Sequence, residues 1–272
     1  MSEYTEPCCC FDSSQYTGVP DTAPTAHTLD VPSVIAEVDR LNNSGREAEA
    51  QHYLEAQRTV ASEIGDWRAE LTIISELLGQ YRRSLEREKG IGAVNDALDL
   101  IRSHRMGTTV SGATVLINAA TTMKCFGLGR ESVPVFRHAA HVYREHLDPS
   151  DYRFAGLYNN MALSFADAGQ PEEAERHFRL ALSVLEKCPG SENELAVTWC
   201  NLAELFSNID PEDARIDACV ENAWATLNAP GLSMDGYHAF TISKCVPSFD
   251  RLGYFLYADT LRKRAEEIYA GH

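Results

Sequence analysis

Residues 155–185 read AGLYNNMALSFADAGQPEEAERHFRLALSVL and contain two amphipathic helical patterns on either side of Gly169. In each pattern the apolar residues recur every three or four positions, which is typical of the buried face of an α-helix. They are Tyr158, Met161, Ala162 and Phe165 in the first pattern, and Ala174, Phe178, Ala181, Leu182 and Leu185 in the second. Gly169 suits the end of the first helix, and Pro171 suits the first turn of the second. The stretch therefore predicts a helical hairpin with alanines where its two helices cross.

The same pattern recurs along the chain with a period of about 42 residues. Each first helix has a small or compact residue at its crossing point, and these residues lie 41 to 43 positions apart. They are Val38, Gly79, Ala120, Ala162, Ala203 and Val246. An inward residue early in each second helix recurs at 40 to 43 positions, through Ala50, Ala93, Val133, Ala174, Ile216 and Ala258. Stacked helical pairs with such a period form a solenoid. We therefore predict an all-α fold, an α-solenoid of about six antiparallel helix pairs.

The chain divides into an irregular N-terminal tail and a repeat region. Residues 1–30 lack periodicity, and we expect Cys8, Cys9 and Cys10 to be unpaired thiols there. Residues 31–272 are predicted to form a single helical repeat domain. Its pairs are expected at about 31–64, 66–105, 109–147, 150–188, 191–228 and 234–270. The second helix of the fifth pair is expected from Pro211 to Leu227. Pro247 falls inside the last first-helix pattern, and we expect it to kink or end that helix near Lys244.

Two runs of the sequence resemble a known family. LYNNMALSFADAGQPEEAERHFRLALSVLEK, followed by ELAVTWCNLAELF, resembles the tetratricopeptide repeat in the long-period subtype of kinesin light chains and related bacterial proteins. The resemblance implies a right-handed superhelix whose first helices line a concave groove. Extended peptides or partner helices usually bind in such a groove.

Composition excludes several classes of protein. The formal net charge of −16 argues against nucleic-acid binding, which needs a basic face. No apolar run is long enough to predict a membrane span, and the N-terminus does not resemble a secretory signal. Together with scattered cysteines, these features favour a cytoplasmic protein. No motif predicts a cofactor.

Asparagines recur at one position of three consecutive first helices. Asn118, Asn160 and Asn201 each precede a crossing residue by two positions and lie 42 and 41 residues apart. An amide offers both a donor and an acceptor, so such a ladder could bind the peptide groups of an extended ligand. The family resemblance also implies asparagines that face the groove. The alternative is that each amide only bridges neighbouring helices or repeats.

Further candidates flank the ladder. Asn159, Lys124 and Glu204 lie on or near the same helix face, and Lys244 takes the asparagine position in the sixth pair. Lys124 and Lys244 could receive a carboxylate from a ligand, or could simply be solvated.

No catalytic or metal constellation is present in the sequence. Neither an HExxH motif nor a cysteine–histidine cluster occurs at ligand spacing, so His138, His141 and His146 are expected to be solvated or packed. We therefore predict a non-catalytic scaffold that binds a protein or an extended peptide. The alternative is a bacterial peptide-sensing regulator that acts through protein–protein contacts.

Overall fold

The computed structural model describes residues 28–271, which contain helices and no strands. The all-α prediction is therefore confirmed over this range, whereas Cys8, Cys9 and Cys10 lie outside it. Twelve α-helices and one short 3₁₀-helix are present among these residues. The first six are α1 (Val31–Asn43), α2 (Glu47–Glu63), α3 (Trp67–Ser84), α4 (Arg87–Ser103), α5 (Val110–Cys125) and α6 (Gly129–His146), with the 3₁₀-helix η2 (Met106–Thr108) before α5. The others are α7 (Arg153–Asp167), α8 (Pro171–Leu185), α9 (Glu192–Ile209), α10 (Arg215–Leu227), α11 (Gly236–Arg251) and α12 (Phe255–Ala270).

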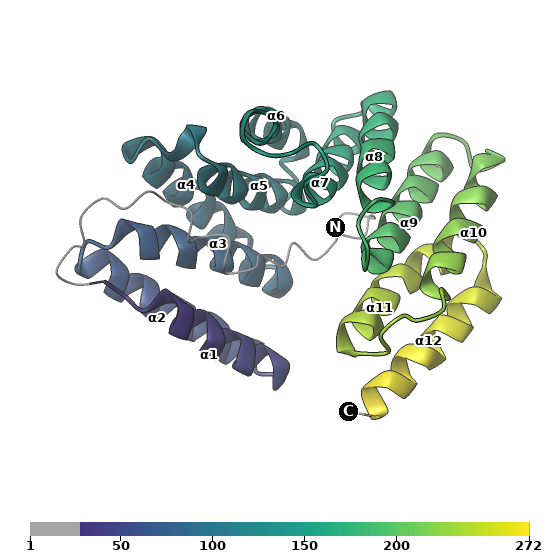
Figure 1. Cartoon of the computed structure of the whole chain (residues 1–272), viewed down its shortest axis with the longest axis horizontal. Helices are drawn as coiled ribbons and strands as arrows, with labels where there is room; N and C mark the ends of the chain where they lie inside the picture. The colour runs from purple at the N-terminus through teal and green to yellow at the C-terminus, as the bar shows by residue number, and fades with distance from the viewer. Residues whose placement is uncertain (1–27, 272) are drawn as a thin grey trace. The chain divides into compact units, whose positions relative to one another are not determined.

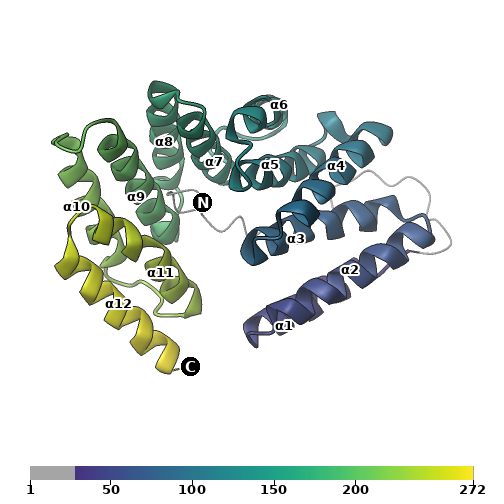
Figure 2. The same cartoon turned by 180° about the vertical axis from the view of Figure 1, so that it is seen from behind.

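The described residues fall into two compact units. Residues 28–147 form the first unit, with α1 to α6, and residues 148–271 form the second, with α7 to α12. Each unit holds three helical hairpins, and successive helices lie side by side (Figures 1 and 2). Within a unit, the first helices of consecutive hairpins are also in contact: α3 packs against α5, and α9 packs against α11. This stacking is the arrangement expected of a helical repeat. Whether residues 31–272 act as a single domain stays a prediction.

Local sequence signals fix the helix ends. Gly169 has φ +71° after α7, a left-handed conformation that glycine adopts without a steric penalty. Pro171 is the first residue of α8, as predicted. Asp66 caps α3 by accepting a hydrogen bond from the Ala69 amide at 3.1 Å, and Thr109 caps α5 in the same way from Gly112 at 3.0 Å. These caps satisfy amides that a helix start leaves without intrahelical partners.

The core of each hairpin is built where the helices cross. Ala120, Ala162 and Ala203 at the predicted crossing positions have no exposed surface. Phe165 and Phe178 fill the α7–α8 hairpin and are 1% and 0% exposed. Burial of one such phenylalanine contributes roughly 1.5–3 kcal/mol to folding.

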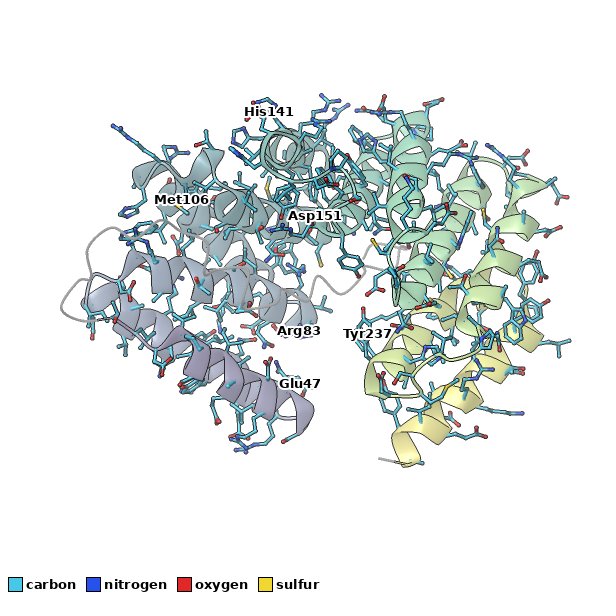
Figure 3. The ribbon with its side chains drawn as sticks, in the orientation of Figure 1. Glu47, Arg83, Met106, His141, Asp151 and Tyr237 are labelled. Atoms are coloured by element: carbon cyan, nitrogen blue, oxygen red, sulfur yellow. The ribbon has the colours of Figure 1, made fainter. Side chains whose placement is uncertain are left out.

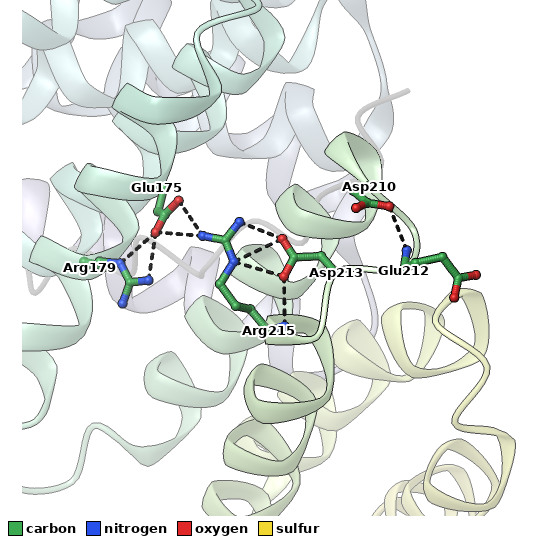
Figure 4. Close-up of polar contacts among 6 residues, drawn as sticks. All are labelled: Glu175, Arg179, Asp210, Glu212, Asp213 and Arg215. Atoms are coloured by element: carbon green, nitrogen blue, oxygen red, sulfur yellow. Dashed lines mark hydrogen bonds and ion pairs between the residues drawn. The ribbon is translucent and has the colours of Figure 1, made fainter.

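The predicted start of α10 is wrong by four residues. The sequence pattern begins this helix at Pro211, whereas α10 starts at Arg215. Aspartate side chains hold a turn there instead: Asp210 accepts from the Glu212 amide at 3.0 Å, and Asp213 accepts from the Arg215 amide at 2.9 Å. The Arg215 guanidinium also contacts both Asp213 and Glu175 of α8 (Figure 4). Local hydrogen bonds of this kind compete with helix formation.

Pro247 does not end its helix. α11 continues through Pro247 to Arg251, so the prediction that the helix ends near Lys244 is wrong, whereas the alternative, a kink at the proline, stays a prediction. Ile242 and Phe249 on either side of the proline are buried, at 0% and 1% exposure. The packing of both turns compensates for a helix interruption that costs about 3 kcal/mol.

None of the helices between residues 28 and 271 combines the length and apolar character that crossing a membrane requires.

Candidate functional site

The asparagine ladder lies on first helices and is buried. Asn118 is on α5 in the first unit, while Asn160 on α7 and Asn201 on α9 belong to the second unit. Their exposed fractions are 3%, 0% and 0%. Buried amides need hydrogen-bond partners, because an unsatisfied polar atom costs free energy.

In the first unit, Asn118 bridges two repeats. Its Nδ2 donates to Ser75 Oγ at 2.8 Å, and Ser75 lies on α3, 43 positions earlier. Asn118 Oδ1 is buried and has no hydrogen-bond partner among the described residues. One half of the amide therefore joins neighbouring repeats, and the other half keeps an unused acceptor.

In the second unit, the predicted residues Asn201 and Asn159 meet. Asn201 Nδ2 on α9 donates to Asn159 Oδ1 on α7 at 3.2 Å. Asn159 is 1% exposed, and its Nδ2 has no hydrogen-bond partner among residues 28–271. This pair again bridges first helices of consecutive repeats. It leaves a donor unused, whereas Asn118 leaves an acceptor unused.

The charged candidates divide into buried and exposed groups. Lys124 on α5 is 2% exposed. Glu204 on α9 is 3% exposed, and Arg251 of α11 donates Nε to its two carboxylate oxygens at 3.0 and 3.2 Å. Lys244 is exposed on α11, with its Nζ 5.3 Å from the centre of the Phe240 ring. The carboxylate of Glu204 is thus engaged within the repeat array, whereas the ammonium group of Lys244 faces outward.

Sequence reasoning missed two arginines beside these candidates. Arg251 is the partner of Glu204, and its distance of 47 residues from Glu204 departs from the repeat period. Arg82 on α3 donates to Thr122 Oγ1 at 2.9 Å, one turn beyond Asn118. Arg82 stands 42 residues before Lys124, so the repeat period could have indicated that the two residues occupy equivalent positions.

Glu76 is a third residue that sequence reasoning missed. It lies on α3 and forms no hydrogen bond or ion pair with the residues that the structure describes. Burial raises the pKa of its carboxyl from 4.5 to about 7, the nearby Asp39 carboxylate of α1 raises it further, and Arg83 and Arg82 partly offset both effects. Figure 3 labels Arg83 on the same helix. A carboxyl with such a pKa changes its charge near neutral pH.

The cysteines and histidines do not form a reactive centre in the described part of the chain. Cys245 is fully buried, and its hydrogen-bond contact with Cys200 raises the pKa of the Cys200 thiol, as does burial. Thiols in this state are poor nucleophiles. No group of three or more metal-ligating side chains occurs between residues 28 and 271.

Comparisons with known proteins agree with this geometry. Residues 153–216 match a family model described as "Tetratricopeptide repeat". No curated protein matches the chain. Among solved structures, BtubC (BKLC) from P. vanneervenii is 19% identical, with 90% of this chain and 92% of that chain covered and a TM-score of 0.53. A putative kinesin light chain with nearly identical TPR-like repeats, from Podosopora anserina, is 14% identical, with 74% and 95% covered and a TM-score of 0.52. At these identities the likeness shows the fold.

Proposed function

We propose that this chain, whose residues 153–216 match the tetratricopeptide repeat and whose fold is like that of kinesin-light-chain-type repeat proteins, binds an extended segment of a partner protein on the buried amides of its first helices. Tetratricopeptide repeats serve as non-catalytic scaffolds for protein interaction. Stacked repeats create long surfaces that suit extended ligands.

Unused hydrogen-bonding capacity in the asparagines carries the proposal. Asn118 Oδ1 can accept from a peptide N–H, and Asn159 Nδ2 can donate to a peptide carbonyl. Each unsatisfied buried atom costs about 1–3 kcal/mol, and a main-chain ligand would recover that cost. Since a peptide group offers one donor and one acceptor, each amide can recognise a peptide group of a ligand within its own unit, largely independently of the ligand's side chains.

The burial of the amides sets a condition on binding. Asn118 and Asn159 are 3% and 1% exposed, so the ligand must displace the groups that cover them. Recognition therefore couples to a local opening of the first-helix face, which costs free energy and lowers the apparent affinity.

The test compares matched pairs of asparagine substitutions. An unstructured peptide is first selected from a display library against the intact chain, and its affinity is measured by calorimetry. The Asn118→Ala/Asn159→Ala protein is expected to bind the peptide about fivefold more weakly, because the unit that holds the peptide loses one hydrogen bond of about 1 kcal/mol. The Asn95→Ala/Asn222→Ala control changes one exposed amide in each unit and is expected to leave the affinity unchanged.

A further variant separates binding from bridging. Ser75→Ala removes the acceptor of the Asn118 bridge but keeps the Asn118 amide, so peptide affinity should persist. If the asparagine pair variant remains equally helical and binds the peptide as tightly as the unmodified chain, Asn118 and Asn159 only pack between repeats and the proposal fails.

A further inference from the structure

The last hairpin of the second unit, α11–α12, exposes much of the apolar surface of the chain. Eleven large apolar side chains are exposed in the described residues, and six of them lie between Met234 and Tyr269. Phe240 on α11 is 37% exposed, and Leu256 in the first turn of α12 is 82% exposed. Apolar side chains that gather on one part of a surface mark an interaction site.

In the preceding hairpin, one stripe of α9 contacts α11. Glu204 of α9 accepts a hydrogen bond from Arg251 Nε at 3.0 Å, and Asn193 Oδ1 lies 2.8 Å from His238 Nδ1. The stripe consists of residues spaced by four, three and four positions, which share one helix face: Asn193, Val197, Cys200 and Glu204. Its last three members are 4%, 3% and 3% exposed. A first helix therefore uses this stripe to contact the first helix that follows it.

The equivalent stripe of α11 is exposed. The step from the crossing residue Ala203 to the crossing residue Val246 is 43 positions. The same step leads from the α9 stripe to four exposed residues, referred to here as the Phe240 stripe: Gly236, Phe240, Ser243 and Pro247. A phenylalanine between small residues offers apolar surface that another helix can approach closely. The Phe240 stripe thus continues the α9–α11 interface, and no helix between residues 28 and 271 covers it.

A carboxylate recurs on the second helices of the same unit. Glu175 on α8, Asp217 on α10 and Asp259 on α12 lie 42 residues apart. Glu175 accepts a hydrogen bond from Arg215 Nη1 at 3.2 Å, and Arg215 begins α10 (Figure 4). Asp217 accepts from the hydroxyl of Tyr254, which immediately precedes α12. In both cases the donor comes from the start of the following second helix.

Asp259 has no donor of this kind among the described residues. Its Oδ1 accepts from Arg262 Nη1 at 2.6 Å within α12. Glu175 makes a similar bond within its own helix, from Arg179 Nη2 at 2.7 Å, and still accepts from Arg215. A local arginine therefore leaves such a carboxylate able to accept a second donor. Asp259 Oδ2 is the atom that could do so on α12.

We propose that the Phe240 stripe and Asp259 together dock a helical hairpin of a partner protein. Its first helix would cover the stripe, and its second helix would begin with an arginine or tyrosine that binds Asp259. The proposal goes beyond recognition of an extended main chain by the first-helix amides, because it uses another surface and a folded ligand. A partner that supplies the missing helix pair would bury the exposed apolar surface as α11 does for α9.

A second copy of the chain fits this surface less well. Its α1 would have to take the place of the covering first helix. Between Val31 and Asn42, α1 exposes no large apolar side chain, and it carries an ion pair in which Arg40 Nη2 lies 2.6 Å from Glu37 Oε1. A polar helix face of this kind would leave the Phe240 stripe without apolar contacts.

The probe is a labelled two-helix peptide. Leucines line one face of its first helix, and an arginine occupies the first turn of its second helix. A second peptide has glutamine in place of that arginine. In fluorescence anisotropy titrations with the full chain, the arginine peptide is expected to bind about threefold more tightly, because one partly exposed charge pair contributes modestly.

Matched variants test both parts of the surface. Phe240→Glu should weaken binding of both peptides at least tenfold, because it places a charge in an apolar contact. Val60→Glu on α2 is the control, since Val60 is 39% exposed and the change in net charge is the same; it should leave the affinity unchanged. Asp259→Asn should abolish the preference for the arginine peptide. Asp99→Asn should keep it, although Asp99 also pairs with an arginine three positions on.

Several outcomes would overturn the proposal. Failure of both peptides to bind, or equal losses in Phe240→Glu and Val60→Glu, would exclude the stripe as a docking surface. A preference for the arginine peptide that persists in Asp259→Asn would exclude the carboxylate. Self-association in sedimentation velocity that only Phe240→Glu abolishes would assign the surface to a second copy of the chain. The display-selected extended peptide should bind Phe240→Glu with unchanged affinity, and its loss would show that the two surfaces are not separate.

Discussion

Replacement of Glu76 by glutamine should stabilise the protein at pH 8 and leave it nearly unchanged at pH 4.5. Burial and the Asp39 carboxylate raise the pKa of Glu76 from 4.5 to about 7 in the folded chain. Between pH 4.5 and about pH 7 the Glu76 carboxyl keeps its proton in the folded state but has lost it in the unfolded state. The free energy of unfolding therefore falls as the pH rises through this window. Below the window the carboxyl is neutral in both states, and above it the folded chain carries an unfavourable buried charge.

The size of the effect follows from the change in pKa. Each unit corresponds to 1.36 kcal/mol, so the rise from 4.5 to about 7 gives at most about 3 kcal/mol. Glutamine keeps the shape of the side chain but carries no charge. The expected gain in the free energy of unfolding is therefore up to about 3 kcal/mol at pH 8.

Urea unfolding followed by circular dichroism measures this difference at both pH values. Glu88→Gln, at an exposed position in the first turn of α4, serves as the control and should show little pH-dependent gain. The reasoning is refuted if Glu76→Gln changes the free energy of unfolding by the same amount at pH 4.5 and pH 8.

Three other predictions concern packing and repeat architecture. Gly112→Ala should destabilise the chain by about 1–3 kcal/mol, because an added Cβ would lie 2.0 Å from the Met106 carbonyl oxygen. At Gly92 an added Cβ would meet nothing within 4 Å, so Gly92→Ala should raise the free energy of unfolding by about 0.5–1 kcal/mol. Thermal unfolding of the two variants measures both effects. Ala162→Leu should lower the free energy of unfolding by about 1–3 kcal/mol through overpacking, measured as a lower midpoint in urea, and an unchanged midpoint would show that the α7–α8 crossing is loose. A chain that ends at Pro189 should keep the circular dichroism signal of its remaining helices, because repeat contacts are between neighbours, and a complete loss of helicity would contradict that view.

The repeat pattern predicts the fold well because it depends on local periodicity. Gly169 and Pro171 mark the joint of the α7–α8 hairpin at the observed positions. The start of α10 could not be predicted from apolar spacing, because the Asp210 and Asp213 side chains hold a turn there. The passage of α11 through Pro247 depends on tertiary packing, which a local rule for proline does not include.

The positions of the candidate residues could be predicted from the sequence, but their hydrogen-bond partners could not. The period locates Asn118 and Asn201 on first helices, yet their observed partners, Ser75 and Asn159, depend on how neighbouring helices stack. The ion pair between Glu204 and Arg251 could not be predicted from the sequence either, because the 47 residues between them do not match the repeat period. Burial of the amides could not be inferred either, because an asparagine at a groove position and one at a repeat interface give the same pattern in sequence.

The most direct test of main-chain recognition is a comparison of two scans on the display-selected peptide. In one, each backbone amide is methylated in turn, and in the other, each side chain is replaced by alanine. If the first-helix amides bind an extended main chain, N-methylation at the contact positions should weaken binding about tenfold, while most alanine replacements should have little effect. Tolerance of N-methylation at every position, together with strong losses from alanine replacements, would contradict the proposed role of Asn118 and Asn159.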